Sequence, residues 1–131
     1  MNVGATAAAG TQVASHYIFF DPLNNLNFLG TVNFDSAVLG IITETGLLTA
    51  SDALAKTGVT YLSPVLRGLE GGDVASISGT RQISINFTAA SPGDYIRVIT
   101  AISPSAGPEP GSLASAGLAL AGLGLMGRRK A

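Results

Sequence analysis

The most constraining feature of this sequence lies near its C-terminus, where residues 111–127 contain no charged side chain. As a helix rising roughly 1.5 Å per residue, this segment would extend about 25 Å, near the short end of what crosses a bilayer core of roughly 30 Å. A basic cluster follows at Arg128, Arg129 and Lys130, and such clusters stay on the cytoplasmic side of a membrane. We therefore expect a transmembrane helix over 111–127, with its main apolar side chains at Leu113, Leu118, Leu120, Leu123, Leu125 and Met126.

A proline-rich tripeptide, Pro108-Glu109-Pro110, lies directly before this segment. Proline fixes its own φ and disfavours helix in the residue before it, so the tripeptide is expected to be extended just outside the membrane. An extended segment suits a protease or transpeptidase, and GPI signals also join a processing site to a disposable apolar tail. Two other interpretations stay open, a permanent membrane anchor and a buried helix of a soluble domain.

The tripeptide, the uncharged segment and the basic cluster together resemble the PEP-CTERM sorting signal, and the resemblance covers residues 108–131. It implies an exopolysaccharide-producing Gram-negative bacterium, export by the general secretory route, and processing near Pro108 by a membrane exosortase. It also implies a protein linked to exopolysaccharide or biofilm, held transiently in the cytoplasmic membrane before it reaches the outer surface or extracellular matrix. The implied partners are exosortase, membrane lipid and exopolysaccharide.

Residues 15–102 have the pattern of a mainly β domain. Leu26–Asp35 alternates apolar and polar side chains, which is typical of a half-buried strand. A hairpin is expected around Gly79. Turn signals about 8–12 residues apart predict a jelly-roll-like β-sandwich, with the C-terminal hydrophobic helix added to it. The further expected strands are Ser15–Asp21, Val38–Thr43, Val59–Leu62, Val65–Leu69, Asp73–Ser78, Gln82–Phe87 and Tyr95–Ile102, and the one short helix is Thr49–Lys56.

The segments at either side of this domain differ in composition from it. Residues 1–14 are mostly Ala, Gly and Thr and predict a flexible lead-in, while 103–107 predict a linker. Members of the resembled family begin with a secretory signal peptide, which 1–14 lack because the first basic residue is Lys56. Three explanations stay open: the recorded start lies too late, the chain is a fragment, or the gene is degraded. If upstream residues are missing, the β domain is expected to be truncated at its N-terminus.

Charge and cysteine content exclude several classes of function. Up to Gly127 the chain carries four basic and eight acidic residues, and an acidic body argues against nucleic-acid binding. The absence of cysteine excludes disulfides, thiolate metal sites and cysteine nucleophiles. His16 is the single histidine and is expected on a strand surface, and no G-x-S-x-G motif accompanies it.

We therefore expect a non-catalytic protein with no cofactor and no metal site. Five aspartates are expected to be turn residues, and they are Asp21, Asp35, Asp52, Asp73 and Asp94. A calcium site in a loop stays open as an alternative. Such a site would need several of these oxygen ligands to converge. The alternative to a non-catalytic envelope or matrix protein is an enzyme acting on extracellular polysaccharide. Such an enzyme would need a facing carboxylate pair drawn from these aspartates, Glu44 and Glu70.

Overall fold

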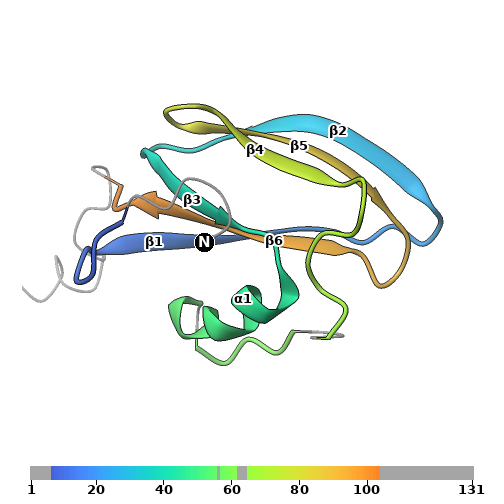
Figure 1. Cartoon of the computed structure of the whole chain (residues 1–131), viewed down its shortest axis with the longest axis horizontal. Helices are drawn as coiled ribbons and strands as arrows, with labels where there is room; N and C mark the ends of the chain where they lie inside the picture. The colour runs from blue at the N-terminus through green and yellow to red at the C-terminus, as the bar shows by residue number, and fades with distance from the viewer. Residues whose placement is uncertain (1–6, 56, 62–64, 104–131) are drawn as a thin grey trace, which may run out of the picture.

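A computed structural model describes residues 7–55, 57–61 and 65–103. Within these ranges the chain forms six strands in two three-stranded antiparallel sheets, together with one α-helix and one short 3-10 helix (Figure 1). The elements are β1 (Val13–Phe20), β2 (Leu26–Asn33), β3 (Val38–Ile42), α1 (Thr45–Ala50), η1 (Asp52–Leu54), β4 (Val74–Gly79), β5 (Gln82–Ala89) and β6 (Asp94–Ala101). The prediction of a mainly β domain is confirmed.

The first sheet has the order β1-β6-β3, with β6 between the other two strands. Both faces of β6 are covered, so that seven of its eight residues are buried. Ile96 and Val98 point to the core between the sheets, while Ile99 packs on the opposite face against Ile42 and Leu48. This explains why apolar residues occur on both faces of β6, as expected for a strand covered on both sides.

The second sheet has the order β2-β5-β4, and its β4–β5 hairpin turns between Gly79 and Gln82 as the sequence predicts. Ile83, Ile85 and Phe87 alternate with polar residues along β5, and all three are buried. Because side chains alternate across a strand, one face of β5 supplies the core and the other stays polar. The strand predicted at Gln82–Phe87 is thus confirmed.

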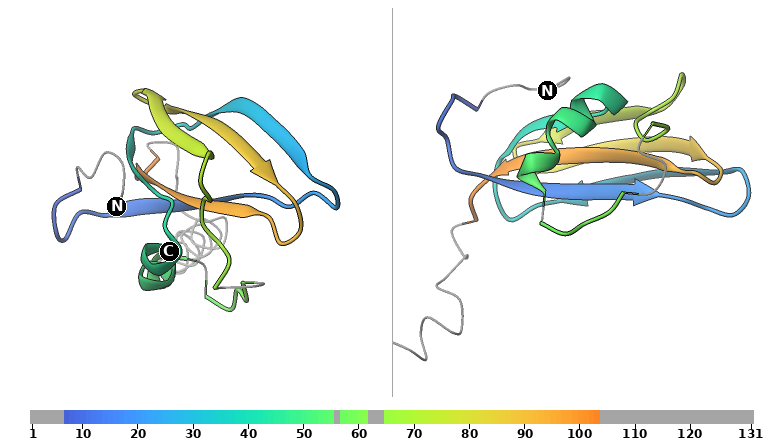
Figure 2. Two further views of the ribbon diagram at one scale, coloured as in Figure 1. Left: turned by 45° about the vertical axis from the view of Figure 1, so that its right-hand side comes forward. Right: turned by 90° about the horizontal axis from the view of Figure 1, so that it is seen from below.

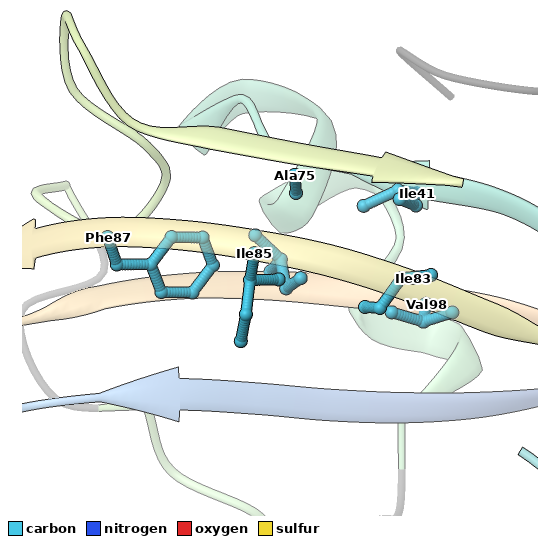
Figure 3. Packing of buried hydrophobic residues seen from close by; sticks show 7 residues of the cluster. Ile41, Ala75, Ile83, Ile85, Phe87 and Val98 are labelled. Carbon is cyan, nitrogen blue, oxygen red and sulfur yellow. The ribbon is translucent and has the colours of Figure 1, made fainter. Parts of the chain in front are cut away.

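The hydrophobic core lies between the two sheets (Figure 3). Its buried members come from strands of both sheets and are Ile41, Ala75, Ile83, Ile85, Phe87, Ile96 and Val98. Burying a large apolar side chain contributes about 1.5–3 kcal/mol relative to leaving it exposed. The two sheets share no ladder of backbone hydrogen bonds, so side-chain contacts across this layer hold them together.

The helical segment covers the outer face of the first sheet, opposite the second sheet (Figures 1 and 2). Leu48 of α1 is completely buried against Ile42 and Ile99. The predicted helix over Thr49–Lys56 was placed too late, because α1 begins at Thr45 and ends at Ala50. Burial of Leu48 accounts for the earlier start, since tertiary packing of an apolar side chain outweighs local capping preferences in a short helix.

The two predicted strands around Pro64 are also wrong, because neither 57–61 nor 65–69 contains a strand. Residues 65–69 instead attach to the junction between β3 and α1. Leu69 N–H donates to the Thr43 carbonyl at 2.9 Å, and Thr45 Oγ1 donates to the Arg67 carbonyl. Gly68 has a φ of 110° and lies so close to Thr43 and Thr45 that a Cβ there would be 2.8 Å from their backbone atoms. This loop requires glycine.

The core is open to a cavity between the edge strands β1 and β2. This cavity has a volume of about 310 Å³ and is lined by apolar side chains from both sheets, which are Ile18, Phe19, Phe20, Phe28, Val32, Ile85 and Phe87. Phe28 is 42% exposed. The jelly-roll-like connectivity and the truncated N-terminus stay predictions, and the expected hydrophobic helix over 111–127 lies outside the described residues.

Candidate functional site

The residues predicted to carry sorting lie outside the part of the chain that the structure describes. They are the tripeptide Pro108, Glu109 and Pro110, the apolar residues of the span, and the basic cluster Arg128, Arg129 and Lys130. Among the described residues, no helix is long and apolar enough to cross a membrane. The site that the structure does describe is on the β domain, at the outer face of the first sheet.

Its centre is the arginine cluster, in which the carboxylate of Asp52 binds both Arg67 and Arg97. Arg67 Nη2 lies 2.6 Å from Asp52 Oδ2, and Arg97 Nη2 lies 3.0 Å from Asp52 Oδ1. The two arginine side chains are only 1% and 0% exposed, whereas that of Asp52 is 34% exposed. One carboxylate on η1 therefore joins the loop before β4 to the middle of β6.

Arg97 also reaches the end of α1. Its Nη1 donates to the Leu48 carbonyl at 3.1 Å and to the Ser51 hydroxyl. Carbonyls in the last turn of a helix have no partner within the helix, and arginine is a common group to satisfy them. Arg97 therefore joins the end of α1 to the middle of β6.

The charges of the arginine cluster change the protonation of Asp52. Its partial burial alone would raise the pKa, but hydrogen bonds and charges from Arg67 and Arg97 outweigh that effect and hold the pKa of Asp52 below its usual value. Asp52 is therefore ionised at neutral pH. The arginine cluster then holds two cations and one anion, which leaves one positive charge at the base of the site.

Aromatic rings surround this positive charge. Arg67 Cζ lies 4.6 Å from the centroid of the Tyr61 ring, and Arg97 Cζ lies 5.6 Å from that of Tyr17. Arg97 Nη2 also donates to the Tyr61 hydroxyl at 3.2 Å. Guanidinium groups over aromatic faces are attracted by the ring quadrupole, by about 0.5–2 kcal/mol depending on solvent access. The rings thus offset part of the unbalanced charge.

Four rings form a row that we call the aromatic groove, made of Tyr61, Tyr17, Tyr95 and Phe19. Successive centroids along this row are 4.6, 5.5 and 6.1 Å apart. Phe19 is 65% exposed, and the rings line a cavity of about 250 Å³ together with Asp21, Val59 and Thr60. Burial raises the pKa of the Tyr17 and Tyr95 hydroxyls, so they stay protonated donors at neutral pH. The groove can hold a small ring with an apolar face and a polar rim.

Sequence reasoning missed the arginine cluster. A signal for Arg97 was available, because it is the single charge within the otherwise apolar run Tyr95–Ile102. A charged residue there is either paired or costly. No comparable signal marked Arg67 or Tyr61, whose loops approach β6 only in the folded chain.

A second group of polar side chains, the acidic pocket, contains Glu70, Asp73 and Asp94. Asp94 begins β6 and is only 5% exposed, and its Oδ2 is buried without a hydrogen-bond partner. Burial raises the pKa of Asp94 to about 6, and the charges of Asp73 and Glu70 and a hydrogen bond with Asp73 act in the same direction. A cavity of about 230 Å³ adjoins Glu70 and Asp94.

Of the remaining sequence-predicted residues, His16 and Asp35 lie outside these groups, while Asp21 lines the aromatic groove. His16 is in β1, as expected, but it is half-buried rather than on the surface. Its Nε2 lies 3.0 Å from Thr100 Oγ1, and its ring packs 4.9 Å from that of Phe34. Asp21 and Asp35 are exposed. In residues 7–55, 57–61 and 65–103, no three His, Cys, Asp or Glu side chains gather closely enough to hold a metal ion.

Comparison with known proteins identifies one segment of the chain. Residues 108–130 match the family model of the PEP-CTERM protein-sorting motif. No curated protein and no solved structure matches the chain significantly.

Proposed function

We propose that this chain is a non-catalytic protein of the cell envelope or extracellular matrix, because residues 108–130 match the PEP-CTERM protein-sorting motif. The motif implies a secreted protein with a C-terminal sorting signal that an exosortase processes. The β domain is then the part delivered outside the cytoplasmic membrane. The family match is the observation that carries this proposal.

In this proposal residues 111–127 hold the protein in the cytoplasmic membrane until it is processed. Five leucines together contribute about −1.5 to −3 kcal/mol to insertion, and the small residues between them oppose it. Insertion is thus favourable but marginal, which suits a temporary anchor. The basic cluster keeps the C-terminal end on the cytoplasmic side, so Pro108-Glu109-Pro110 faces the exosortase outside.

The delivered domain is, in this proposal, a jelly-roll-like sandwich. The supporting observation is the nested pairing of its strands, in which β1 pairs with β6 and β2 pairs with β5. Strands β1 to β4 enter the two sheets alternately, and β5 and β6 then return to pair with β2 and β1, as in double-sheet jelly rolls.

We further propose that the delivered domain associates with exopolysaccharide through the aromatic groove. Sugar rings have apolar faces that pack on aromatic side chains, and hydroxyl rims that need polar partners. Phe19 offers an exposed ring, and the exposed Asp21 carboxylate offers a polar contact at the same cavity. Phe19→Ala should lower retention on the host polysaccharide, measured by affinity electrophoresis. Leu29→Ala, which removes an exposed apolar side chain from the other sheet, is the matched control.

The acidic pocket bears on the alternative of a polysaccharide-acting enzyme. Glycosidases place their two carboxyl groups roughly 5–9.5 Å apart on either side of the substrate bond. Asp73 and Asp94 are close enough for a hydrogen bond between them, which leaves no room for a sugar. This supports the non-catalytic proposal.

The deciding experiment is the intact mass of the protein, expressed with a functional signal peptide in hosts with and without the exosortase. We expect loss of a C-terminal fragment starting near Pro108 only where the exosortase is present. Replacing Pro108-Glu109-Pro110 by alanines should abolish that loss. A full-length, membrane-bound product in both hosts would instead identify residues 111–127 as a permanent anchor and overturn the sorting proposal.

A further inference from the structure

Asp94 is a buried carboxylate with an unsatisfied oxygen. It lies on the same face of β6 as Ile96 and Val98, so its side chain points into the layer between the sheets. Its Oδ2 has no hydrogen-bond donor, and the residue is 5% exposed. A buried polar atom without a partner is uncommon in folded proteins and calls for a proton, a water or an ion that satisfies it.

The neighbours of Asp94 make this position more negative. Asp73 and Glu70 both act on it electrostatically. Asp73 is itself held in place, because its Oδ1 accepts a 2.7 Å hydrogen bond from the Thr88 N–H. Glu70 and Asp94 line a cavity of about 230 Å³ together with residues 88–92, and Asp73 is joined to the wall of this cavity through its hydrogen bond with Thr88.

We propose that the acidic pocket binds a calcium ion, with Asp73 and Asp94 as carboxylate ligands. Calcium takes oxygen ligands of mixed kinds, including backbone carbonyls and water, and tolerates irregular geometry. In this proposal Asp73 and Asp94 supply two of the oxygen ligands, and water in the cavity supplies others. Glu70, exposed at the rim, adds negative charge that attracts the cation.

Calcium fits this pocket better than other metals. Zinc and copper favour imidazole and thiolate ligands, and the pocket is lined by oxygen-bearing and apolar side chains. Magnesium requires near-ideal octahedral geometry and gives up its water reluctantly. With only two direct carboxylates, we expect a dissociation constant of about 10⁻⁴–10⁻³ M, as in extracellular calcium modules.

The test compares thermal unfolding and calorimetric titration of the full-length chain at pH 7 after treatment with EDTA. CaCl₂ at about 10 mM should raise the unfolding temperature through binding to the native state, and MgCl₂ at the same concentration should raise it less. Asp94→Asn and Asp73→Asn should each weaken calcium binding by about tenfold or more, because each removes one of two charged ligands. Asp35→Asn makes the same change of charge at an exposed position and should bind calcium as the unmodified chain does.

Two results would overturn the proposal. In the first, calcium changes neither the unfolding temperature nor the heat of titration of the unmodified chain, which means that no calcium binds to Asp73 and Asp94. In the second, calcium stabilises Asp94→Asn as much as it stabilises the unmodified chain, which places the ion elsewhere. Calorimetry separates both results from a change in stability caused by the substitution alone. Neither result depends on how the C-terminal segment is sorted.

Discussion

Arg97 Nη2 lies 3.0 Å from Asp52 Oδ1, although 45 residues separate the two in the chain. This contact joins the central strand of one sheet to η1, and Arg67 binds the other oxygen of the same carboxylate. Three distant segments thus depend on one side chain. The loop that carries Tyr61 is attached to the same cluster by its bond to Arg97.

Asp52→Asn should lower the free energy of unfolding by about 2–4 kcal/mol, because it leaves two buried guanidinium groups without a counter-charge. Urea unfolding at pH 7 measures this effect, with Asp35→Asn as the control of equal charge change. In the unmodified chain, the stability from Asp52 is present above its unfolded pKa of 3.8 and is lost as the pH falls through its lower folded pKa. An unchanged urea midpoint would show that the arginine cluster does not hold the helical segment.

Asp94→Asn should stabilise the calcium-free protein at neutral pH. The folded pKa of Asp94, about 6, lies above its unfolded value of 3.8. The native state therefore binds more protons, and stability falls as the pH rises from about 4 to 6, by up to about 3 kcal/mol. In EDTA, Asp94→Asn should remove this part of the pH dependence. A profile with the same slope between pH 4 and 6 would assign the titration to another group.

Gly93→Ala should destabilise the domain by about 3 kcal/mol or more, because a Cβ at Gly93 would overlap the backbone of β1. That Cβ would lie 2.7 Å from the carbonyl carbon of Phe20 and closer still to its oxygen. Gly71→Ala is the matched control, since a Cβ there meets nothing within 4 Å. Thermal unfolding of both variants checks this prediction, and equal unfolding temperatures would contradict it.

Phe87→Ala should lower the free energy of unfolding by about 3–5 kcal/mol, because it creates a cavity in the layer between the sheets. Phe87 is completely buried there. Leu23→Ala, at a side chain that is 93% exposed, should change stability by less than about 0.5 kcal/mol. Chemical denaturation of the two variants makes the comparison. Similar losses in both would mean that the two sheets are not held together by this core.

Leu120→Arg should abolish retention in the membrane, because one arginine near the middle of a span costs about 2.5–3.5 kcal/mol, as much as the leucines contribute. Membrane fractionation of an exosortase-free host measures the effect. Leu120→Ile keeps the apolar character and should remain in the membrane fraction. If the arginine variant also stays there, residues 111–127 do not act as a membrane segment.

The sorting motif at 108–130, the mainly β class and most strand positions could be predicted from the amino-acid sequence. Each of these depends on a local pattern, such as the alternation of Ile83, Ile85 and Phe87 or the order of tripeptide, uncharged segment and basic cluster. Such patterns can be recognised in the linear sequence because they involve only residues that are close together in the chain. The β4–β5 hairpin was predicted for the same reason, since its two strands are separated only by a turn.

Tertiary contacts determine the start of α1, the course of the loop at 65–69, and the two groups of charged side chains. Leu48 is buried because β3 and β6 provide a surface for it, and that surface does not exist in an isolated helix. Arg67, Arg97 and Asp52 meet because sheet pairing brings three distant segments together, and the same holds for Asp73 and Asp94. Contacts between residues far apart in the sequence produce no periodic pattern. The groups of side chains that they form can therefore be identified only in the folded structure.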